Sequence, residues 1–325
     1  MKKSMLGIDI GTGAIKLVTN DQCVVIDTPE NVFENDHFIA FDGMSEVFKA
    51  AVKEHGIRNK KVSLILPDED LYFSRTTLPL MSEKQLKVNL PYEFSKIVGK
   101  DADQYIYDYS LISRNDHEMD MFIGCIKRQQ IERYQEMFNN AGMKLVSALP
   151  RQMALSKMLV ERKGDIALAD LGYTHTRIDM FKDGVYETGR VLEYGVNAMV
   201  SIASEELYCD EHIALEYLKT NKNDVLHCEK MKDFYDYLST EIMRAVNYYT
   251  YENQENTLET LYYYGGGSNV LPFIETLKNT ISYGGGSNVL PFIETLKNTI
   301  SLRVEAVSTD ADVMSALCGY GASQE

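Results

Sequence analysis

The sequence contains no apolar run of about 18 residues, the length that a membrane-spanning helix requires. Its first residues, Met1-Lys2-Lys3, are not followed by a long apolar segment, so we expect no signal peptide. The last residues, 319–325, are small or polar apart from one tyrosine, and we expect no amphipathic membrane helix there. These absences predict a protein without a membrane anchor of its own.

Paired cysteines are also missing. The cysteines are odd in number and widely spaced, without a Cys-x-x-Cys motif or a Cys/His cluster of metal-binding spacing. We therefore expect reduced thiols in a cytosolic protein. The five residues are Cys23, Cys125, Cys209, Cys228 and Cys318.

Positive charge is scarce relative to negative charge. The 33 Lys and Arg residues face 48 Asp and Glu residues, which gives a formal net charge of -15. This balance argues against binding to a nucleic-acid backbone and against direct docking on anionic lipid. The chain has 325 residues, of which 45% are hydrophobic and 25% are charged, and this is the composition of a globular protein with room for two domains.

A glycine-rich turn lies near the start of the chain. Residues 6–10 read as an apolar strand, which runs into the turn Asp9-Ile10-Gly11-Thr12-Gly13. Residues 14–19 then alternate in polarity, which predicts a returning strand instead of the helix of a P-loop or dinucleotide fingerprint. Amides in such a turn can hold phosphate oxygens, and Asp9 can hold waters of a phosphate-bound Mg²⁺. An ordinary glycine hairpin is the alternative.

The rest of the chain predicts mixed strands and helices. A β-rich block with two helices spans about 62–146 and should form a subdomain, and Pro91 predicts a kink or break in its first helix. A second hairpin follows, in which strand 165–171 ends in Asp170-Leu171-Gly172 and strand 175–181 returns. The helix predicted over 228–251 has an apolar stripe, which we interpret as core: Leu238, Ile242, Ala245, Val246 and Tyr249.

A 19-residue segment near the end occurs twice in succession. Residues 264–282 and 283–301 both read YGGGSNVLPFIETLKNTIS. Such a copy indicates a recent duplication or a sequence error, because solenoids need about three or more diverged repeats. The apolar residues 258–264 lead into the first copy as a strand, and a helix should begin near Pro272. We therefore expect the first Gly-Gly-Gly-Ser-Asn loop to contact a nucleotide and the second copy to be an insertion.

Three motifs follow one another along the chain: a hairpin with Asp9, a hairpin with Asp170 and a Gly-Gly-Gly-Ser-Asn loop. This order resembles the actin-like ATPase superfamily, with its two phosphate loops and its adenosine loop. The resemblance implies an α/β, actin-like (ribonuclease H-like) two-domain fold with an inserted α+β subdomain. It places domain 1 at 1–165 with the insertion at about 62–146, and domain 2 at 166–325. The helical part of domain 2 would span about 197–256, and a segment at about 311–325 would return to domain 1.

Within this superfamily the chain resembles the branch of the cell-division protein FtsA and the pilus protein PilM. The likeness to the PilM family covers nearly the whole chain and rests on residues 75–81, 83–93, 108–112, 134–155, 211–219 and 241–249. It implies a cytoplasmic ATP-binding scaffold of type IV pilus assembly at the inner face of the cell membrane. Its partners would be the N-terminal tail of a PilN-like membrane protein, bound in a nucleotide-dependent way, and pilus motor components.

Two other functions are alternatives. An FtsA-like division protein is disfavoured because residues 319–325 cannot form an amphipathic membrane helix. A small-molecule kinase of the actin and hexokinase superfamily needs an acid that activates the substrate hydroxyl, and no acid with a surrounding motif is evident.

The resemblance further implies a site for ATP and Mg²⁺. Asp9 and Asp170 would hold the hydrated Mg²⁺, and Asp170 and Gln152 would be the catalytic candidates. The glycine loop Gly265, Gly266, Gly267 and Ser268 would lie against the adenosine, and Glu216 and Lys219 would flank ribose and adenine. The phosphates would be contacted by Gly11, Thr12, Gly13, Lys16, Gly172 and Thr174.

The chain departs from the family pattern at two places. Relatives usually carry Gly-Gly after the pair Glu193-Tyr194, whereas this chain has Gly195-Val196, which predicts a weaker approach of the backbone there. Only Gln152 lies near the position of a water-orienting side chain, so we expect at most a slow ATPase.

Three of the candidate residues have an ordinary structural role as the alternative. Lys16 is equally explained as a solvated lysine on an exposed strand face. Glu216 and Lys219 are three residues apart on a predicted helix, where a surface ion pair is at least as good an explanation as a ligand contact.

Overall fold

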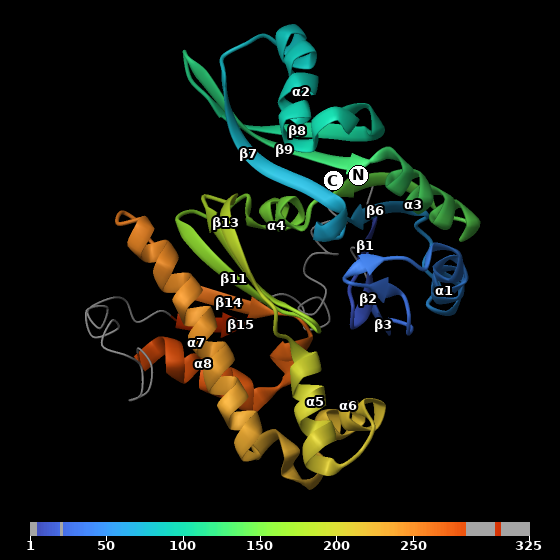
Figure 1. Ribbon diagram of the computed structural model, residues 1–325, viewed down its shortest axis with the longest axis vertical. Coiled ribbons are helices and arrows are strands. Elements are labelled where there is room, and N and C mark those ends of the chain that lie inside the picture. The colour runs from blue at the N-terminus through green and yellow to red at the C-terminus, as the bar shows by residue number, and fades with distance from the viewer. Residues whose placement is uncertain (1–4, 20–21, 284–302, 307–325) are drawn as a thin grey trace. The chain divides into compact units, whose positions relative to one another are not determined.

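The computed structural model describes residues 5–19, 22–283 and 303–306, and Figure 1 labels their helices and strands. By internal contacts the described residues divide into two units. The first contains residues 5–10, 15–19 and 22–154, and the second contains residues 11–14, 155–283 and 303–306. The predicted C-terminal return at 311–325 and residues 284–301 of the second repeat copy lie outside the described residues.

The main sheet of the first unit begins with the predicted hairpin. β1 (Leu6–Ile10) pairs antiparallel with β2 (Ala14–Val18), so a strand follows the glycines, as predicted. β1 also pairs in parallel with β6 (Lys61–Ile65), which pairs in parallel with β10 (Lys144–Leu149). With β3 (Cys23–Asp27) at one edge, the strand order is β10-β6-β1-β2-β3.

Two amphipathic helices supply the core of this unit. α1 (Phe41–Glu54) and α3 (Arg128–Asn140) each bury one apolar stripe, and together with β1, β2 and β6 they form a single hydrophobic cluster. Phe48 and Phe138 from the two helices lie with ring centroids 5.3 Å apart. Smaller elements are β4 (Phe33–Glu34), β5 (His37–Phe38) and the 3-10 helix η1 (Asp68–Asp70).

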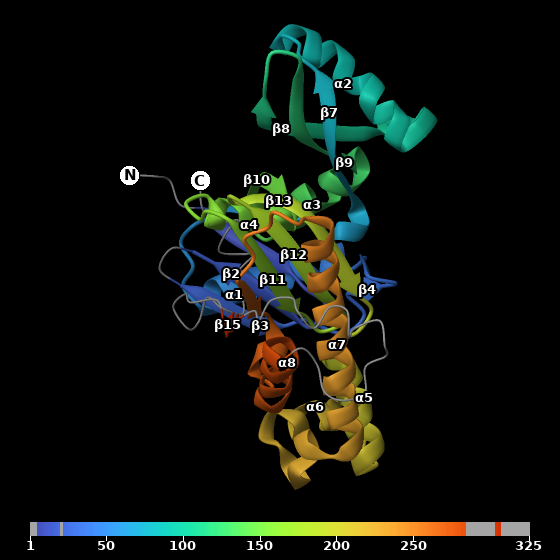
Figure 2. The ribbon, with the colours of Figure 1, turned by 90° about the vertical axis from the view of Figure 1, so that its left-hand side faces the viewer.

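A three-stranded antiparallel sheet and one helix form the inserted part of this unit. The sheet order is β7-β9-β8, with β7 (Leu71–Pro79), β8 (Tyr105–Arg114) and β9 (Glu118–Lys127). Figure 2 shows α2 (Glu83–Val98) along one face, where its buried stripe packs against β9. η2 (Gly99–Gln104) follows α2. The helix begins with a capping box between Ser82 and Gln85 and continues through Pro91, so the predicted break is wrong.

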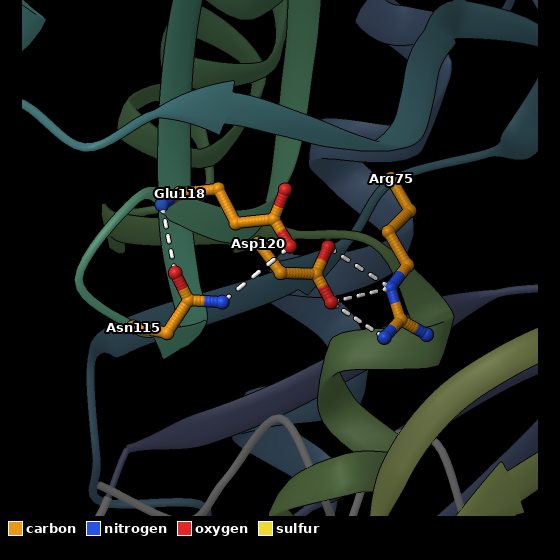
Figure 3. Close-up of polar contacts among 4 residues, drawn as sticks. All are labelled: Arg75, Asn115, Glu118 and Asp120. Carbon is orange, nitrogen blue, oxygen red and sulfur yellow. Dashed lines mark hydrogen bonds and ion pairs between the residues drawn. The ribbon is translucent and has the colours of Figure 1, made fainter.

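Polar side-chain contacts join the strands of the inserted sheet at two points (Figure 3). Asn115 Oδ1 accepts hydrogen bonds from the backbone N–H groups of His117 at 2.8 Å and Glu118 at 2.9 Å, which turns the chain from β8 into β9. Arg75 on β7 binds Asp120 on β9 through Nε and Nη2, with distances of 2.9 and 2.5 Å to Oδ2. The pair lies diagonally across the two strands, because Arg75 faces Phe122 in the register.

The sheet of the second unit repeats the path of the first. β11 (Asp165–Leu171) pairs antiparallel with β12 (Thr176–Lys182), and β12 pairs antiparallel with β13 (Val185–Leu192). β11 also pairs in parallel with β14 (Thr260–Tyr264), which pairs in parallel with β15 (Arg303–Ala306). The order β13-β12-β11-β14-β15 therefore corresponds strand by strand to β3-β2-β1-β6-β10. Such internal repetition is what the actin-like prediction implies.

Helices and a 3-10 segment complete the second unit. They are α5 (Val196–Leu207), α6 (Glu211–Thr220), η3 (Lys222–His227), α7 (Glu229–Glu252) and α8 (Leu271–Tyr283), and α4 (Arg151–Leu159) joins the two units in sequence. The predicted stripe on α7 is buried at all five positions and belongs to the core of this unit, so the core interpretation is confirmed.

The first repeat copy forms a strand end, a loop and a helix. Tyr264 ends β14, the loop contains the 3-10 turn η4 (Gly266–Asn269), and α8 begins at Leu271. This confirms the predicted layout. No helix within the described ranges is long and apolar enough to cross a membrane.

Candidate functional site

The first predicted phosphate turn is a tight hairpin turn. The N–H of Gly11 donates to the carbonyl oxygen of Ala14 at 3.1 Å and so closes the turn. Asp9 and Lys16 face each other across the hairpin, and Lys16 Nζ lies 3.1 Å from Asp9 Oδ2. The two side chains are 20% and 19% exposed, so both retain contact with solvent. Lys16 is therefore the ion-pair partner of Asp9, a contact that was not predicted.

The second predicted turn has the same construction. The N–H of Gly172 donates to the carbonyl oxygen of His175 at 3.0 Å, as Gly11 does to Ala14. Each turn follows an Asp-x-Gly sequence, with Asp170 in the place of Asp9. Within the second unit, which includes residues 11–14, Thr12 Oγ1 lies 3.0 Å from Thr174 Oγ1. Two predicted phosphate residues are thus brought together.

The start of α5 is attached to this second turn. The N–H groups of Val196 and Asn197 donate to the carbonyl oxygens of Gly172 and Tyr173 at 3.1 and 2.9 Å. A Cβ on Gly195 would lie 2.3 Å from the Tyr173 oxygen, so this position requires glycine. The backbone thus lies close to the second turn at Gly195, and a weaker approach than in relatives with Gly-Gly stays a prediction.

The first glycine loop lies against the end of β11. Gly265 has φ of 92°, and a Cβ there would lie 2.6 Å from Asp170 Oδ1 and 2.8 Å from the Leu171 carbonyl oxygen. The parallel register, which pairs Asp170 with Tyr264, causes this proximity. Gly267 is buried, whereas Gly266 is exposed, and a Cβ at Gly266 would meet no described atom within 4 Å.

Ser268 has a structural role in the same loop. Its side chain is buried and its Oγ donates to the carbonyl oxygen of Gly265 at 2.6 Å, while its N–H donates to the same oxygen at 3.1 Å. The hydroxyl therefore holds the loop in shape. The structure brings the loop together with Asp170, and Gly266 is the loop glycine that presents an open backbone.

Glu216 and Lys219 form the predicted surface ion pair on α6. Lys219 Nζ lies 2.7 Å from Glu216 Oε1, and the lysine and glutamate side chains are 50% and 64% exposed. The structural alternative is thus present, and a contact with ribose or adenine stays a prediction. Gln152 is on α4, and its Oε1 is buried without a hydrogen-bond partner among the described residues. Its catalytic role also stays a prediction.

Two residues of this region, His175 and Glu193, were not predicted. His175 follows Thr174 directly, and its Nδ1 lies 2.8 Å from Thr174 Oγ1. Its Nε2 lies 3.0 Å from Glu193 Oε2. The register pairs Thr176 with Leu192, so the next residues outward are His175 and Glu193. Extending the predicted strand pairing by one residue would have found this contact.

Tyr173, in the second turn, is partly buried by this packing. Burial raises the pKa of the Tyr173 hydroxyl above its ordinary value, and the Glu211 carboxylate adds to this shift. Among the described residues no group of three or more His, Cys, Asp and Glu side chains is arranged to hold a metal directly.

Comparison with known proteins identifies the family. The family model "Type IV pilus assembly protein PilM" matches residues 7–319. The chain belongs to the PilM family. Among solved structures, it is similar to the PilM-PilN type IV pilus biogenesis complex, with a TM-score of 0.73 and 14% identity over 99% of this chain and 96% of that chain. No curated protein matches its sequence significantly.

Two further structures place this PilM-family chain within a wider fold group. The ethanolamine utilization protein EutJ from Carboxydothermus hydrogenoformans has a TM-score of 0.60 and 12% identity, over 99% of this chain and 90% of that chain. The archaeal actin homolog Ta0583 in complex with ADP has a TM-score of 0.50 and 12% identity, over 98% and 97%. The fold is that of actin-like ATPases, which confirms the fold predicted from the sequence.

Proposed function

We propose that the protein is an ATP-binding scaffold of type IV pilus assembly that holds the N-terminal tail of a PilN-like inner-membrane protein. The observation that carries this proposal is membership of the PilM family, together with the similarity to a PilM-PilN complex over nearly the whole chain. On this proposal the protein works in the cytoplasm, next to the membrane, and reaches the membrane and the pilus motor through its partners.

Three features support nucleotide binding. Each of the two five-stranded sheets has an Asp-x-Gly hairpin, whose glycine-rich turn follows a strand-end carboxylate and is of the kind whose backbone amides can hold phosphate. The carboxylates of Asp9 and Asp170 are oxygen donors suited to the water shell of Mg²⁺, and Lys16 beside Asp9 can supply a cation for phosphate. Gly266 is exposed and a Cβ there would meet no described atom within 4 Å, which allows a flat ring to approach the backbone of the loop after β14.

We further propose that the partner tail binds the inserted sheet on the face opposite α2. Side chains alternate along β7 and β9, so residues Phe73, Arg75, Asp120 and Phe122 share that face. Phe73 and Phe122 are stacked with centroids 5.0 Å apart, next to the Arg75–Asp120 pair. Phe122 is buried and Phe73 is half-buried over it, so Phe73 would be the apolar contact point, beside the charged Arg75 and Asp120, for a short peptide with an apolar anchor.

The test is calorimetric titration of the full chain with a synthetic N-terminal peptide of a PilN-like protein, with and without Mg-ATP. We expect binding that depends on Mg-ATP and that is lost in Phe73→Ser. Tyr92→Ser is the matched control, because Tyr92 is 66% exposed on α2. Thermal unfolding of both variants shows whether Phe73→Ser is folded. Peptide binding that is equal in both variants would contradict the proposed surface.

The nucleotide part of the proposal has its own test. Asp170→Ala should weaken Mg-ATP binding, since the proposed water-mediated cation site loses a carboxylate. Asp183→Ala on the β12–β13 turn is the control, because that side chain caps an exposed backbone N–H at 3.0 Å. Absence of ATP binding by the wild-type chain would refute the proposal. Rapid phosphorylation of a small sugar would instead favour a kinase.

A further inference from the structure

Three side chains at the second turn form a continuous hydrogen-bonded series. Thr174 Oγ1 lies 2.8 Å from His175 Nδ1, and His175 Nε2 lies 3.0 Å from Glu193 Oε2. The histidine side chain is 11% exposed, whereas the glutamate side chain is 79% exposed to solvent. All three residues belong to the second unit. The series joins a hydroxyl, an imidazole and a carboxylate in that order.

The direction of each hydrogen bond follows from donor and acceptor chemistry. An ionised carboxylate only accepts, so His175 Nε2–H donates to Glu193. In the neutral ring Nδ1 then carries no proton and accepts, which means that the Thr174 hydroxyl donates to it. The Thr174 hydroxyl has only this one proton to donate. In its 3.0 Å contact with Thr12, Thr174 Oγ1 therefore accepts and the Thr12 hydroxyl donates. The Nδ1 lone pair of His175 therefore accepts the hydrogen bond that the Thr174 hydroxyl donates.

The backbone around this series keeps it in place. The turn is closed by the Gly172–His175 hydrogen bond, and the carbonyl oxygens of Gly172 and Tyr173 are held by the first N–H groups of α5. His175 and Glu193 come from neighbouring strands at the end of the β12–β13 ladder. Nucleophile, base and an orienting third group within hydrogen-bond reach are the signature of an activated hydroxyl.

We propose that Thr174 is a phosphoryl acceptor, so that the protein phosphorylates itself from a bound nucleoside triphosphate. This inference rests on the nucleotide binding proposed above. Thr174 Oγ1 forms a bond to the terminal phosphorus, while the bond from that phosphorus to the β–γ bridging oxygen breaks and the nucleoside diphosphate leaves. The hydroxyl proton passes to His175 Nδ1 and from there to solvent. His175 is the base, and Glu193 is a positioning residue.

The experiment incubates the full chain with Mg-ATP labelled in the γ-phosphate and locates the label by peptide mass spectrometry. We expect one phosphoryl group on Thr174 in the wild type and none in Thr174→Val. The His175→Gln variant should be slowed about 10²-fold or more, the usual contribution of a general base. Thr188→Val, at an exposed position of β13, should be labelled at Thr174 as the wild type is.

Glu193 requires a readout that a purely structural role would not change. Glu193→Gln should shift the pH–rate profile of labelling, because the imidazole loses its charged partner, and Glu193→Asp should restore part of the rate. Calorimetric ATP binding is measured on the same samples. A wild type that binds no ATP refutes the proposed nucleotide site, whereas one that binds ATP and gains no label refutes only this inference. Release of inorganic phosphate without label, or label on Thr12 instead, also overturns it.

Discussion

Replacement of Asp165 by Asn should destabilise the second unit strongly. Asp165 begins β11 and is only 7% exposed. Its Oδ1 accepts from the Tyr249 hydroxyl at 2.5 Å, and its Oδ2 accepts from the N–H and the hydroxyl of Thr257, both at 2.8 Å. These bonds attach the end of α7 and the segment before β14 to the central strand.

The size of the effect follows from these three bonds. In Asp165→Asn an amide nitrogen replaces one carboxylate oxygen, and an amide nitrogen cannot accept a hydrogen bond. When it stands in the place of Oδ2, it faces the two Thr257 donors, and about two charge-assisted bonds are lost. At about 1.5–3 kcal/mol for each such bond, the free energy of unfolding should fall by roughly 3–6 kcal/mol. Tyr249→Phe removes one bond and should cost about 1.5–3 kcal/mol.

Urea unfolding followed by circular dichroism measures these losses. Tyr251→Phe is the matched control on the same helix, because Tyr251 is 69% exposed, and it should change stability by less than about 0.5 kcal/mol. An Asp165→Asn variant that unfolds at the same urea concentration as the wild type would refute the reasoning. Equal effects of Tyr249→Phe and Tyr251→Phe would also contradict it.

The same carboxylate predicts a pH dependence. Burial alone would raise the pKa of Asp165, but the hydrogen bonds from Tyr249 and Thr257 outweigh it and lower the pKa below the ordinary value of 3.8. A lowered folded-state pKa gives stability that is present above 3.8 and is lost as pH falls through the folded-state value. Wild-type stability should therefore decline more steeply below that pH than the stability of Asp165→Asn.

Three further outcomes are expected. Gly265→Ala should lose about 1–3 kcal/mol of stability and bind Mg-ATP more weakly, because its φ is 92° and the new Cβ meets Asp170 at 2.6 Å; unaltered unfolding and binding would contradict this. Ile242→Ala, in the fully buried stripe of α7, should lose about 2–5 kcal/mol in urea unfolding, against little change for the 43% exposed Ile213→Ala. Deletion of residues 283–301 should leave a folded protein, since β14, the loop and nearly all of α8 come from the first copy; collapse of its thermal transition would show that the second copy is needed.

The sequence predicted those parts of the fold that leave a pattern in neighbouring residues. Alternation after Gly13 predicted a returning strand, and the repeated Asp-x-Gly sequence at Asp9 and Asp170 predicted two equivalent hairpins. The stripe that includes Ile242 predicted the buried face of α7. For the returning strand and for α7, one element's own periodicity was sufficient, because burial on one face leaves a period in the sequence.

The site was predictable only in part, because its contacts depend on register between strands. The Lys16–Asp9 pair and the His175–Glu193 pair join residues on neighbouring strands, and neither strand by itself indicates the partner. The need for glycine at Gly195 comes from the carbonyl oxygens of a turn that lies well before it in the chain. Such constraints are tertiary and leave no local pattern.

The most direct test of the proposed scaffold is calorimetric titration of the full chain with the N-terminal peptide of a PilN-like membrane protein, in Mg-ATP and in buffer alone. The proposal predicts saturable one-to-one binding that is tighter with Mg-ATP, and loss of that difference in Asp170→Ala. Peptide affinity that is identical with and without Mg-ATP, or no binding in either condition, would contradict a nucleotide-dependent scaffold.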